Sequence, residues 1–259
     1  MGQCSMTVAM PILSACGHET CILPTALLST HTGGFGKPVV VHLDEALEGM
    51  WKHWKENRIS FDAILVGYLG SIAAIEIAEQ ILSEMLAPGG ISIVDPAMAD
   101  HGRLYSGFDD NYAKSMERLC RKADIILPNI TEAAMFARMP YRSSPDETYV
   151  RALLKKIHHP CVVLTGVGYD DTQTGAAVFR EGRVECYLHP RAQQNFHGTG
   201  DMFAAAFTGA LMQNKTLLES VKIAADFVCK AIENTCAGPA HWYGVKFETA
   251  LPDLIRWLS

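Results

Sequence analysis

Residues 195–207 combine the residue types needed to bind and transfer a phosphoryl group. Gly198 and Gly200 flank Thr199, Asp201 follows, and an apolar run with helical spacing begins at once. The glycines allow a tight turn that gathers backbone N–H groups, and the helix N-terminus adds further N–H groups and a positive dipole end. This nest suits phosphate, and an ionised Asp201 there could take the proton from an attacking hydroxyl. The alternative is a glycine-rich turn in which Asp201 is an ordinary helix N-cap.

Two more carboxylates follow predicted strands. Glu132 comes three residues after Asn129, where a strand ends and a helix begins, and Asp95 ends an apolar strand just before a proline. Carboxylates can hold magnesium, often through water, because this ion keeps part of its hydration shell. The alternatives are helix capping for Glu132 and turn formation for Asp95.

Composition and motifs exclude several classes of protein. The net charge of −6 gives no basic field for a nucleic-acid backbone, and the eight cysteines form no C-x-x-C pair, which indicates a reducing compartment. The sequence contains no P-loop, G-x-G-x-x-G, G-x-S-x-G or zinc-binding histidine motif. No apolar run is long enough to span a membrane and the N-terminus is a poor signal peptide, so we expect a cytoplasmic protein.

Solidly apolar strand segments alternate with helical segments along the chain. We expect strands over residues 20–24, 61–68, 91–96, 124–129 and 160–166, and an antiparallel hairpin over 176–180 and 184–188. We expect helices over residues 6–16, 43–57, 71–86, 109–122, 131–138, 146–158, 201–213, 217–234 and 246–258, with polar loops at 25–35 and 97–105. Thr131 is the expected N-cap of the helix over 131–138. This order predicts an α/β fold, with helices covering a central, mostly parallel sheet, in a single domain over residues 1–259.

Ligands of such sheets bind beyond the carboxyl ends of the strands. The polar or turn residues at these ends are Tyr68, Asp95, Asn129, Thr165 and Gly166. We therefore expect the catalytic and ligand-binding residues along the edge formed by the carboxyl ends of the strands.

Taken together, the motifs resemble the ribokinase superfamily and, within it, the pyridoxal kinases. The resemblance covers nearly the whole chain, and the order of its motifs is more specific than any one of them. Its motifs are Gly2-Gln-Cys-Ser5, Leu23-Pro-Thr25, Ser29-Thr-His-Thr-Gly-Gly34, Gly67-Tyr-Leu-Gly70, Val94-Asp-Pro96 to Asp100, Gly102-Arg-Leu-Tyr105, Pro128-Asn-Ile-Thr-Glu132 and Gly198-Thr-Gly-Asp201.

This resemblance implies a three-layer α/β/α fold and phosphorylation of the 5′-hydroxymethyl group of pyridoxal, pyridoxine or pyridoxamine by ATP. It implies that Asp201 is the base and that the amides of Gly198, Thr199 and Gly200 hold the developing charge on the transferred phosphoryl group. It further implies that magnesium is held by Asp95 and Glu132, the nucleotide by Asn129, Thr165, Gly166 and Gly198, and the substrate by Ser5, Thr32, Tyr68 and Asp201. It also suggests a homodimer and leaves an assisting monovalent cation open.

Two departures from the family pattern leave alternatives open. The sequence begins at the loop that follows the family's first strand, so we expect that strand to be missing and stability and pyridoxal affinity to suffer. Ala97 and Ala99 also replace the usual Val and Gly. The alternatives are a hydroxymethylpyrimidine or sugar kinase of the same fold, and a non-catalytic binder of pyridoxal phosphate or nucleotide.

Overall fold

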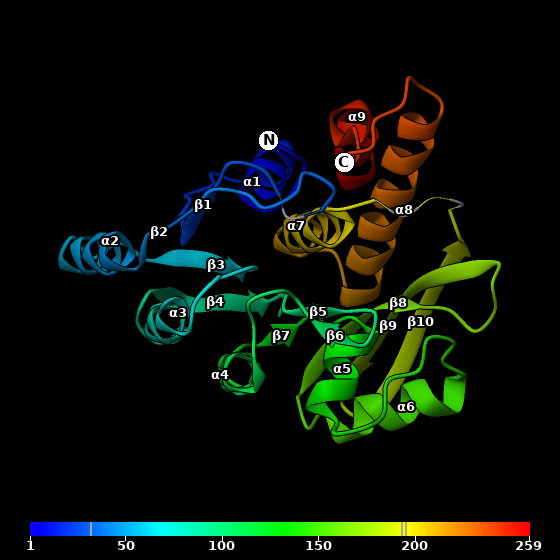
Figure 1. Cartoon of the computed structure of the whole chain (residues 1–259), viewed down its shortest axis with the longest axis horizontal. Helices are drawn as coiled ribbons and strands as arrows, with labels where there is room; N and C mark the ends of the chain where they lie inside the picture. Colours follow the sequence, from blue (N-terminus) through cyan, green and yellow to red (C-terminus); the bar gives the residue numbers. More distant parts are fainter. Residues whose placement is uncertain (32, 193, 195) are drawn as a thin grey trace. The chain divides into compact units, whose positions relative to one another are not determined.

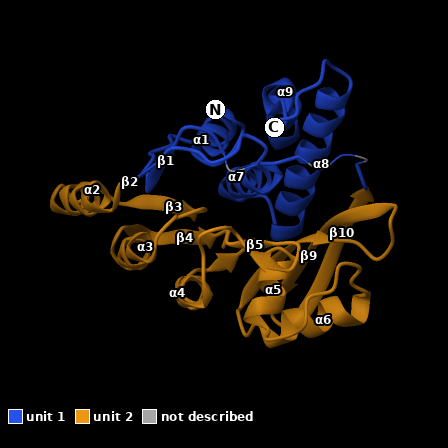
Figure 2. Ribbon diagram, in the orientation of Figure 1, with its two compact units in different colours: residues 1–42, 191–259 blue, residues 43–190 orange. Residues whose placement is uncertain are grey.

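The computed structural model describes residues 1–31, 33–192, 194 and 196–259 (Figure 1). The chain divides into two compact units (Figure 2). Unit 1 contains residues 1–42 and 191–259, and unit 2 contains residues 43–190. The expectation of a single domain over 1–259 stays a prediction.

Unit 2 is built on a mixed sheet with the strand order β10-β9-β8-β7-β4-β3. The neighbours from β3 to β8 pair in parallel, whereas β9 pairs antiparallel with both β8 and β10. The strands are β3 (Phe61–Val66), β4 (Leu86–Val94), β7 (Ile125–Ile126), β8 (Cys161–Val167), β9 (Gln173–Arg180) and β10 (Arg183–Pro190). The predicted hairpin is confirmed, and its turn uses Glu181 and Gly182, which both have positive φ, as a two-residue hairpin loop requires.

The helices of unit 2 follow from the strand order. The chain steps in one direction from β3 to β4, β7 and β8, and right-handed crossovers then put the connecting helices on one face of the sheet. Figure 1 shows α3 to α6 on the same side of these strands. The helices are α2 (Asp44–Glu56), α3 (Ile72–Glu84), α4 (Asp110–Cys120), α5 (Ile130–Phe136) and α6 (Glu147–Lys156).

Three details of unit 2 differ from the sequence expectations. β4 begins at Leu86, and residues 87–90, expected to end a helix, form an irregular stretch of β4 between the residues that pair with Phe61 and Ala63 of β3. The expected loop at 97–105 contains the short antiparallel pair β5 (Ala99–Asp100) and β6 (Arg103–Leu104). The N-cap of α5 is Asn129 rather than Thr131, because the Asn129 amide oxygen accepts the N–H groups of the first turn.

Unit 1 contains α1 (Met6–Ala15) packed against α7 (Thr199–Met212). Gly209 of α7 makes this approach possible, since a Cβ there would overlap the Cys16 side chain. The other elements are β1 (Ala26–Leu28), β2 (Val40–His42), α8 (Leu217–Cys236), the 3₁₀ helix η1 (Phe247–Ala250) and α9 (Leu251–Leu258).

The strand expected at residues 20–24 is wrong. The strand of this region is β1, inside the expected polar loop, where Leu27 pairs with Val41 of β2. A strand needs a hydrogen-bonding partner, and an apolar run does not say which segment will supply it. In the described part of the chain, no helix has the length and apolar character needed to cross a membrane.

Candidate active site

The glycine nest of unit 1 begins at Gly198, the N-cap of α7. Gly198 has φ 83° and ψ 0°, a left-handed conformation that glycine adopts without strain. A Cβ at this position would also overlap the Gln3 carbonyl oxygen. Thr199 and Gly200 open the helix, whose first turn leaves N–H groups without intrahelical acceptors. These N–H groups lie where the sequence predicts an anion site, and their anion-binding role stays a prediction.

Asp201 lies in the first turn of α7 and does not cap it, so the N-cap alternative is wrong. Its Oδ2 accepts the Ser5 backbone N–H at 2.8 Å. Burial raises the pKa of Asp201, and the Ser5 N–H lowers it in part. Burial, with the Asp201 charge second, also raises the pKa of the Cys4 thiol to about 12. Asp201 is thus a half-buried carboxylate whose surroundings raise its pKa.

Ser5 contributes its backbone to this arrangement in an unusual conformation. Its φ of 54° and ψ of −134° are disfavoured for any residue with a side chain. The conformation aims the N–H at Asp201, while the Ser5 residue itself is exposed. Ser5 was expected to contact substrate, and the structure adds a contact with the expected base. Thr32, the other substrate residue expected in unit 1, lies outside the described residues.

Sequence reasoning gave no role to residues 241–244. His31 Nε2 lies 3.0 Å from the Tyr243 carbonyl oxygen, and Gly33 N–H donates to His31 Nδ1 at 3.0 Å. This pattern requires the proton on Nε2. Phe35 adds a ring contact with Trp242, with centroids 4.5 Å apart. These contacts tie the segment around His31 to the C-terminal segment, and only the aromatic residues at 242–243 could have indicated it.

The strand ends of unit 2 lie along one edge of the sheet, as expected. Asp95 N–H donates to the Val66 carbonyl at 2.8 Å, and Asn129 forms a parallel bridge with Thr165. Gly166, in the bulge after Thr165, has φ 72°. The structure therefore brings these predicted residues of unit 2 to neighbouring positions.

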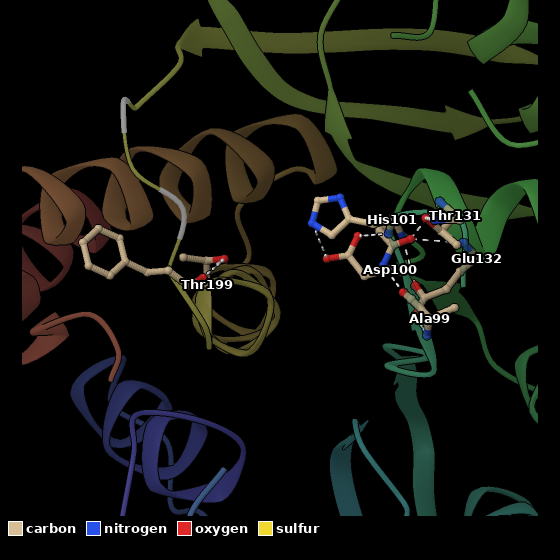
Figure 3. A network of polar contacts seen from close by, with 9 residues as sticks. Ala99, Asp100, His101, Thr131, Glu132 and Thr199 are labelled. Atoms are coloured by element: carbon tan, nitrogen blue, oxygen red, sulfur yellow. Dashed lines mark hydrogen bonds and ion pairs between the residues drawn. The ribbon is translucent and has the colours of Figure 1, made fainter. Parts of the chain in front are cut away.

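Glu132 is 1 % exposed and accepts three backbone N–H groups. Its Oε1 accepts from Met98 at 2.9 Å and Ala99 at 3.3 Å, and its Oε2 accepts from Asn129 at 2.9 Å. The last bond completes a capping box with Asn129. Figure 3 shows Glu132 beside Ala99, Asp100 and Thr131. Glu132 therefore both caps α5 and clamps the loop after β4.

Burial raises the pKa of Glu132 to about 7, although its three N–H partners oppose the shift. The charges of Glu132 and Asp95 both raise the pKa of the buried Cys120 thiol, after the larger effect of burial. The two carboxylates thus share one neighbourhood of unit 2.

The two carboxylates of unit 2, Asp95 and Glu132, fit magnesium better than a metal ion whose ligands all come from the protein. No group of three or more histidine, cysteine or acidic side chains that could hold an ion occurs among the described residues. Magnesium is commonly bound by one or two carboxylates together with water and substrate phosphates. Both Glu132 oxygens already accept N–H groups, so contact through water is the mode that fits. The metal roles of Asp95 and Glu132 stay predictions.

Tyr68 lies two residues beyond the end of β3, and burial raises the pKa of its phenol. Its ring stacks on Phe108, with centroids 5.5 Å apart and an interplanar angle of 29°. Phe108 was not singled out in the sequence, which contains no motif that marks it.

Comparison with known proteins adds a consistent set of relatives. The family model for phosphomethylpyrimidine kinase matches residues 14–244. The crystal structure of pyridoxal kinase from Lactobacillus plantarum is 33% identical, with a TM-score of 0.91, and the match covers 99% of this chain and 93% of that one. A proposed phosphomethylpyrimidine kinase from Bacteroides thetaiotaomicron, in a crystal form with pyridoxal, is also 33% identical, with a TM-score of 0.92 and coverage of 98% and 91%.

The curated relatives include both kinds of kinase. The hydroxymethylpyrimidine/phosphomethylpyrimidine kinase of Bacillus subtilis is 29% identical over 60% of this chain. The pyridoxine kinase of the same organism is 27% identical over 68% of this chain. The matches span 59% and 66% of these two relatives, and only 38% of the bifunctional thiamine biosynthetic enzyme of Arabidopsis thaliana.

Proposed function

Because the chain belongs to the phosphomethylpyrimidine/pyridoxal kinase family, we propose that it phosphorylates the 5′-hydroxymethyl group of pyridoxal, pyridoxine or pyridoxamine with ATP. The ribokinase-like α/β fold predicted from the sequence is confirmed by the same relatives. The chain is therefore a kinase by family, and the vitamin B6 substrate is our proposal.

One observation carries the proposed chemistry: Asp201 is a half-buried carboxylate in the first turn of a helix that begins with a glycine nest. Its raised pKa makes it a stronger proton acceptor than an exposed aspartate. In the proposed role it takes the proton of the 5′-hydroxyl as the oxygen attacks the γ-phosphoryl group of ATP and ADP leaves. The amides of Gly198, Thr199 and Gly200 then stabilise the negative charge on that group.

Unit 2 supplies the proposed metal and nucleotide contacts. Magnesium, when bound, neutralises charge on the nucleotide phosphates. Asp95 and Glu132 would hold it, Glu132 through water, since both Glu132 oxygens accept backbone N–H groups. Asn129, Thr165 and Gly166, at the ends of neighbouring strands, are proposed to contact the nucleotide. We further propose that the enzyme is a homodimer in the cytoplasm. The proposal leaves open whether a monovalent cation assists the reaction.

The second candidate function is phosphorylation of hydroxymethylpyrimidine, favoured by the family model and a Bacillus subtilis relative. Both substrates are heteroaromatic rings with a hydroxymethyl group, so the same base and anion-binding turn would serve either. Support for the B6 vitamers comes from the pyridoxal in the Bacteroides thetaiotaomicron structure and from the segment Thr30-His31-Thr32-Gly33.

The deciding experiment measures ATP consumption with pyridoxal, pyridoxine, pyridoxamine, hydroxymethylpyrimidine and ribose, and identifies each product by mass spectrometry. We expect the largest kcat/KM with a B6 vitamer and a 5′-phosphate product. A preference for hydroxymethylpyrimidine would replace our proposal by the second candidate. Binding of pyridoxal phosphate or nucleotide with no turnover on any substrate would identify a non-catalytic binder.

A further inference from the structure

Three aromatic rings form a continuous stack at the end of β3 in unit 2. Tyr68 stacks on one face of Phe108, and Tyr112 stacks on Phe108 with centroids 3.7 Å apart and an interplanar angle of 5°. The stack runs inward from half-buried Tyr68 and Phe108 to buried Tyr112. The Tyr68 ring thus stacks on Phe108, which in turn stacks on the buried Tyr112 ring.

The inner end of the stack is anchored at the start of α4. The Asp109 side chain caps this helix and accepts the Tyr112 N–H at 2.9 Å. Burial raises the pKa of the Tyr112 phenol, and the Tyr68 phenol adds to this. The cap of α4 therefore fixes the backbone that carries the inner ring.

The middle ring is positioned by the loop that Glu132 clamps. Met98 N–H donates to Glu132 Oε1 at 2.9 Å, and Tyr105 N–H donates to the Met98 carbonyl at 2.8 Å. Phe108 N–H then donates to the Tyr105 carbonyl at 3.1 Å. An unbroken series of contacts therefore connects the Glu132 carboxylate with the Tyr68 ring.

We infer that Phe108 is a positioning residue for the aromatic ring of the substrate, acting through Tyr68. The inference rests on the proposed function and on the substrate contact that the family resemblance implies for Tyr68. Stacking on Phe108 restricts rotation of the Tyr68 side chain, so the ring is held ready before substrate arrives and less entropy is lost on binding. The series of contacts from Glu132 links this support to the loop that follows Asp95.

A purely structural role for Phe108 would give a different result. If Phe108 only filled space beside Tyr112, its replacement would lower the melting temperature and leave substrate affinity unchanged. If it positions Tyr68, its replacement weakens binding of the ring substrate and leaves the affinity for ATP unchanged. The two roles are therefore separated by binding measurements on variants that stay folded.

The test uses Phe108→Leu, the conservative variant Phe108→Tyr, and Phe61→Leu as a matched control. Phe61 begins β3, at the end opposite to Tyr68, and its ring contacts Trp54 with centroids 5.5 Å apart. For Phe108→Leu we expect the KM for pyridoxal, and its Kd by equilibrium dialysis without ATP, to rise about 3- to 10-fold, the size of a lost aromatic pair. Phe108→Tyr keeps both values within about twofold of wild type, and Phe61→Leu leaves both near wild type.

A double-mutant cycle with Glu132→Gln tests the connection through Met98. We expect the two substitutions to be non-additive in pyridoxal affinity, because both loosen the same support. Unchanged pyridoxal Kd in folded Phe108→Leu would overturn the inference. If the wild-type enzyme prefers hydroxymethylpyrimidine, the proposed function fails, and the same variants tested with that substrate still decide the role of Phe108.

Discussion

Asp201 in unit 1 and Glu132 in unit 2 are both carboxylates in the first turn of a helix, and burial raises the pKa of both. They differ in their hydrogen bonds. Asp201 accepts the Ser5 N–H, whereas Glu132 accepts N–H groups from three residues in two separate segments. Within the residues that the structure describes, Asp201 accepts one N–H group and keeps acceptor capacity for a reacting proton, while Glu132 uses most of its capacity to hold the backbone.

The largest effect is expected from Asp201→Asn. The asparagine keeps an oxygen for the Ser5 N–H but cannot take a proton, so kcat falls by about 10²–10⁴-fold while nucleotide affinity and fold are retained. Steady-state kinetics, nucleotide titration and thermal melting check this. The control is Asp253→Asn, which changes a first-turn acid of α9 in the same unit. Turnover near wild type in Asp201→Asn would remove Asp201 from the mechanism.

Glu132→Gln is expected to affect both catalysis and stability. The glutamine loses one acceptor oxygen in a buried site, so the free energy of unfolding falls by about 1–3 kcal/mol. Turnover falls in a magnesium-dependent way and partly recovers at high magnesium. Denaturant unfolding and kinetics across a magnesium series measure the two effects.

The chain offers a matched control for this variant. Thr216 and Glu219 form a capping box at the start of α8 like that of Asn129 and Glu132, but Glu219 is exposed. Glu219→Gln should leave turnover unchanged at every magnesium concentration. An equal loss of turnover at all magnesium concentrations in Glu132→Gln would assign Glu132 to capping alone.

The raised pKa of Glu132 also predicts a pH dependence of stability. Its pKa is about 7 in the folded state, against an ordinary value of 4.5. Between these values the folded state binds the proton more strongly than the unfolded state, so this contribution to stability is present below about pH 4.5 and is lost as pH rises through about 7. The advantage of wild type over Glu132→Gln should therefore be larger at pH 5 than at pH 8, by about 1–3 kcal/mol. Unfolding curves at both pH values check this, and a constant difference would contradict the shift.

The smallest effect concerns the backbone that holds Asp201. Ser5→Gly relieves the strain at φ 54° and keeps the N–H that Asp201 accepts, so we expect about 1 kcal/mol more stability than in Ser5→Ala. Both variants lose the hydroxyl, so any increase in pyridoxal KM should be shared. Equal melting temperatures for the two variants would show that the conformation carries no strain.

Local sequence predicted the helices of both units well, because capping residues and apolar spacing act within a few residues. Local sequence predicted strands less well, because a strand forms only where a second segment supplies its hydrogen-bonding partners. The apolar residues at 20–24 formed no strand, and β1 formed instead where Val40–His42 supplied a partner. Sequence reasoning assigned the N-cap of α5 to Thr131, whereas the structure has Asn129 there. Both residue types cap helices, and only the backbone conformation distinguishes them.

The sequence by itself determined the glycine nest, the position of Asp201 in a first helical turn, and the polar residues that end the strands of unit 2. These features depend on residue type and local spacing. Tertiary structure decided that Ser5 donates its N–H to Asp201, that Glu132 clamps the loop at Met98, and that Phe108 stacks on Tyr68. These contacts join residues far apart in the sequence, from 34 positions for Met98 and Glu132 to 196 for Ser5 and Asp201, and local spacing carries no information about them.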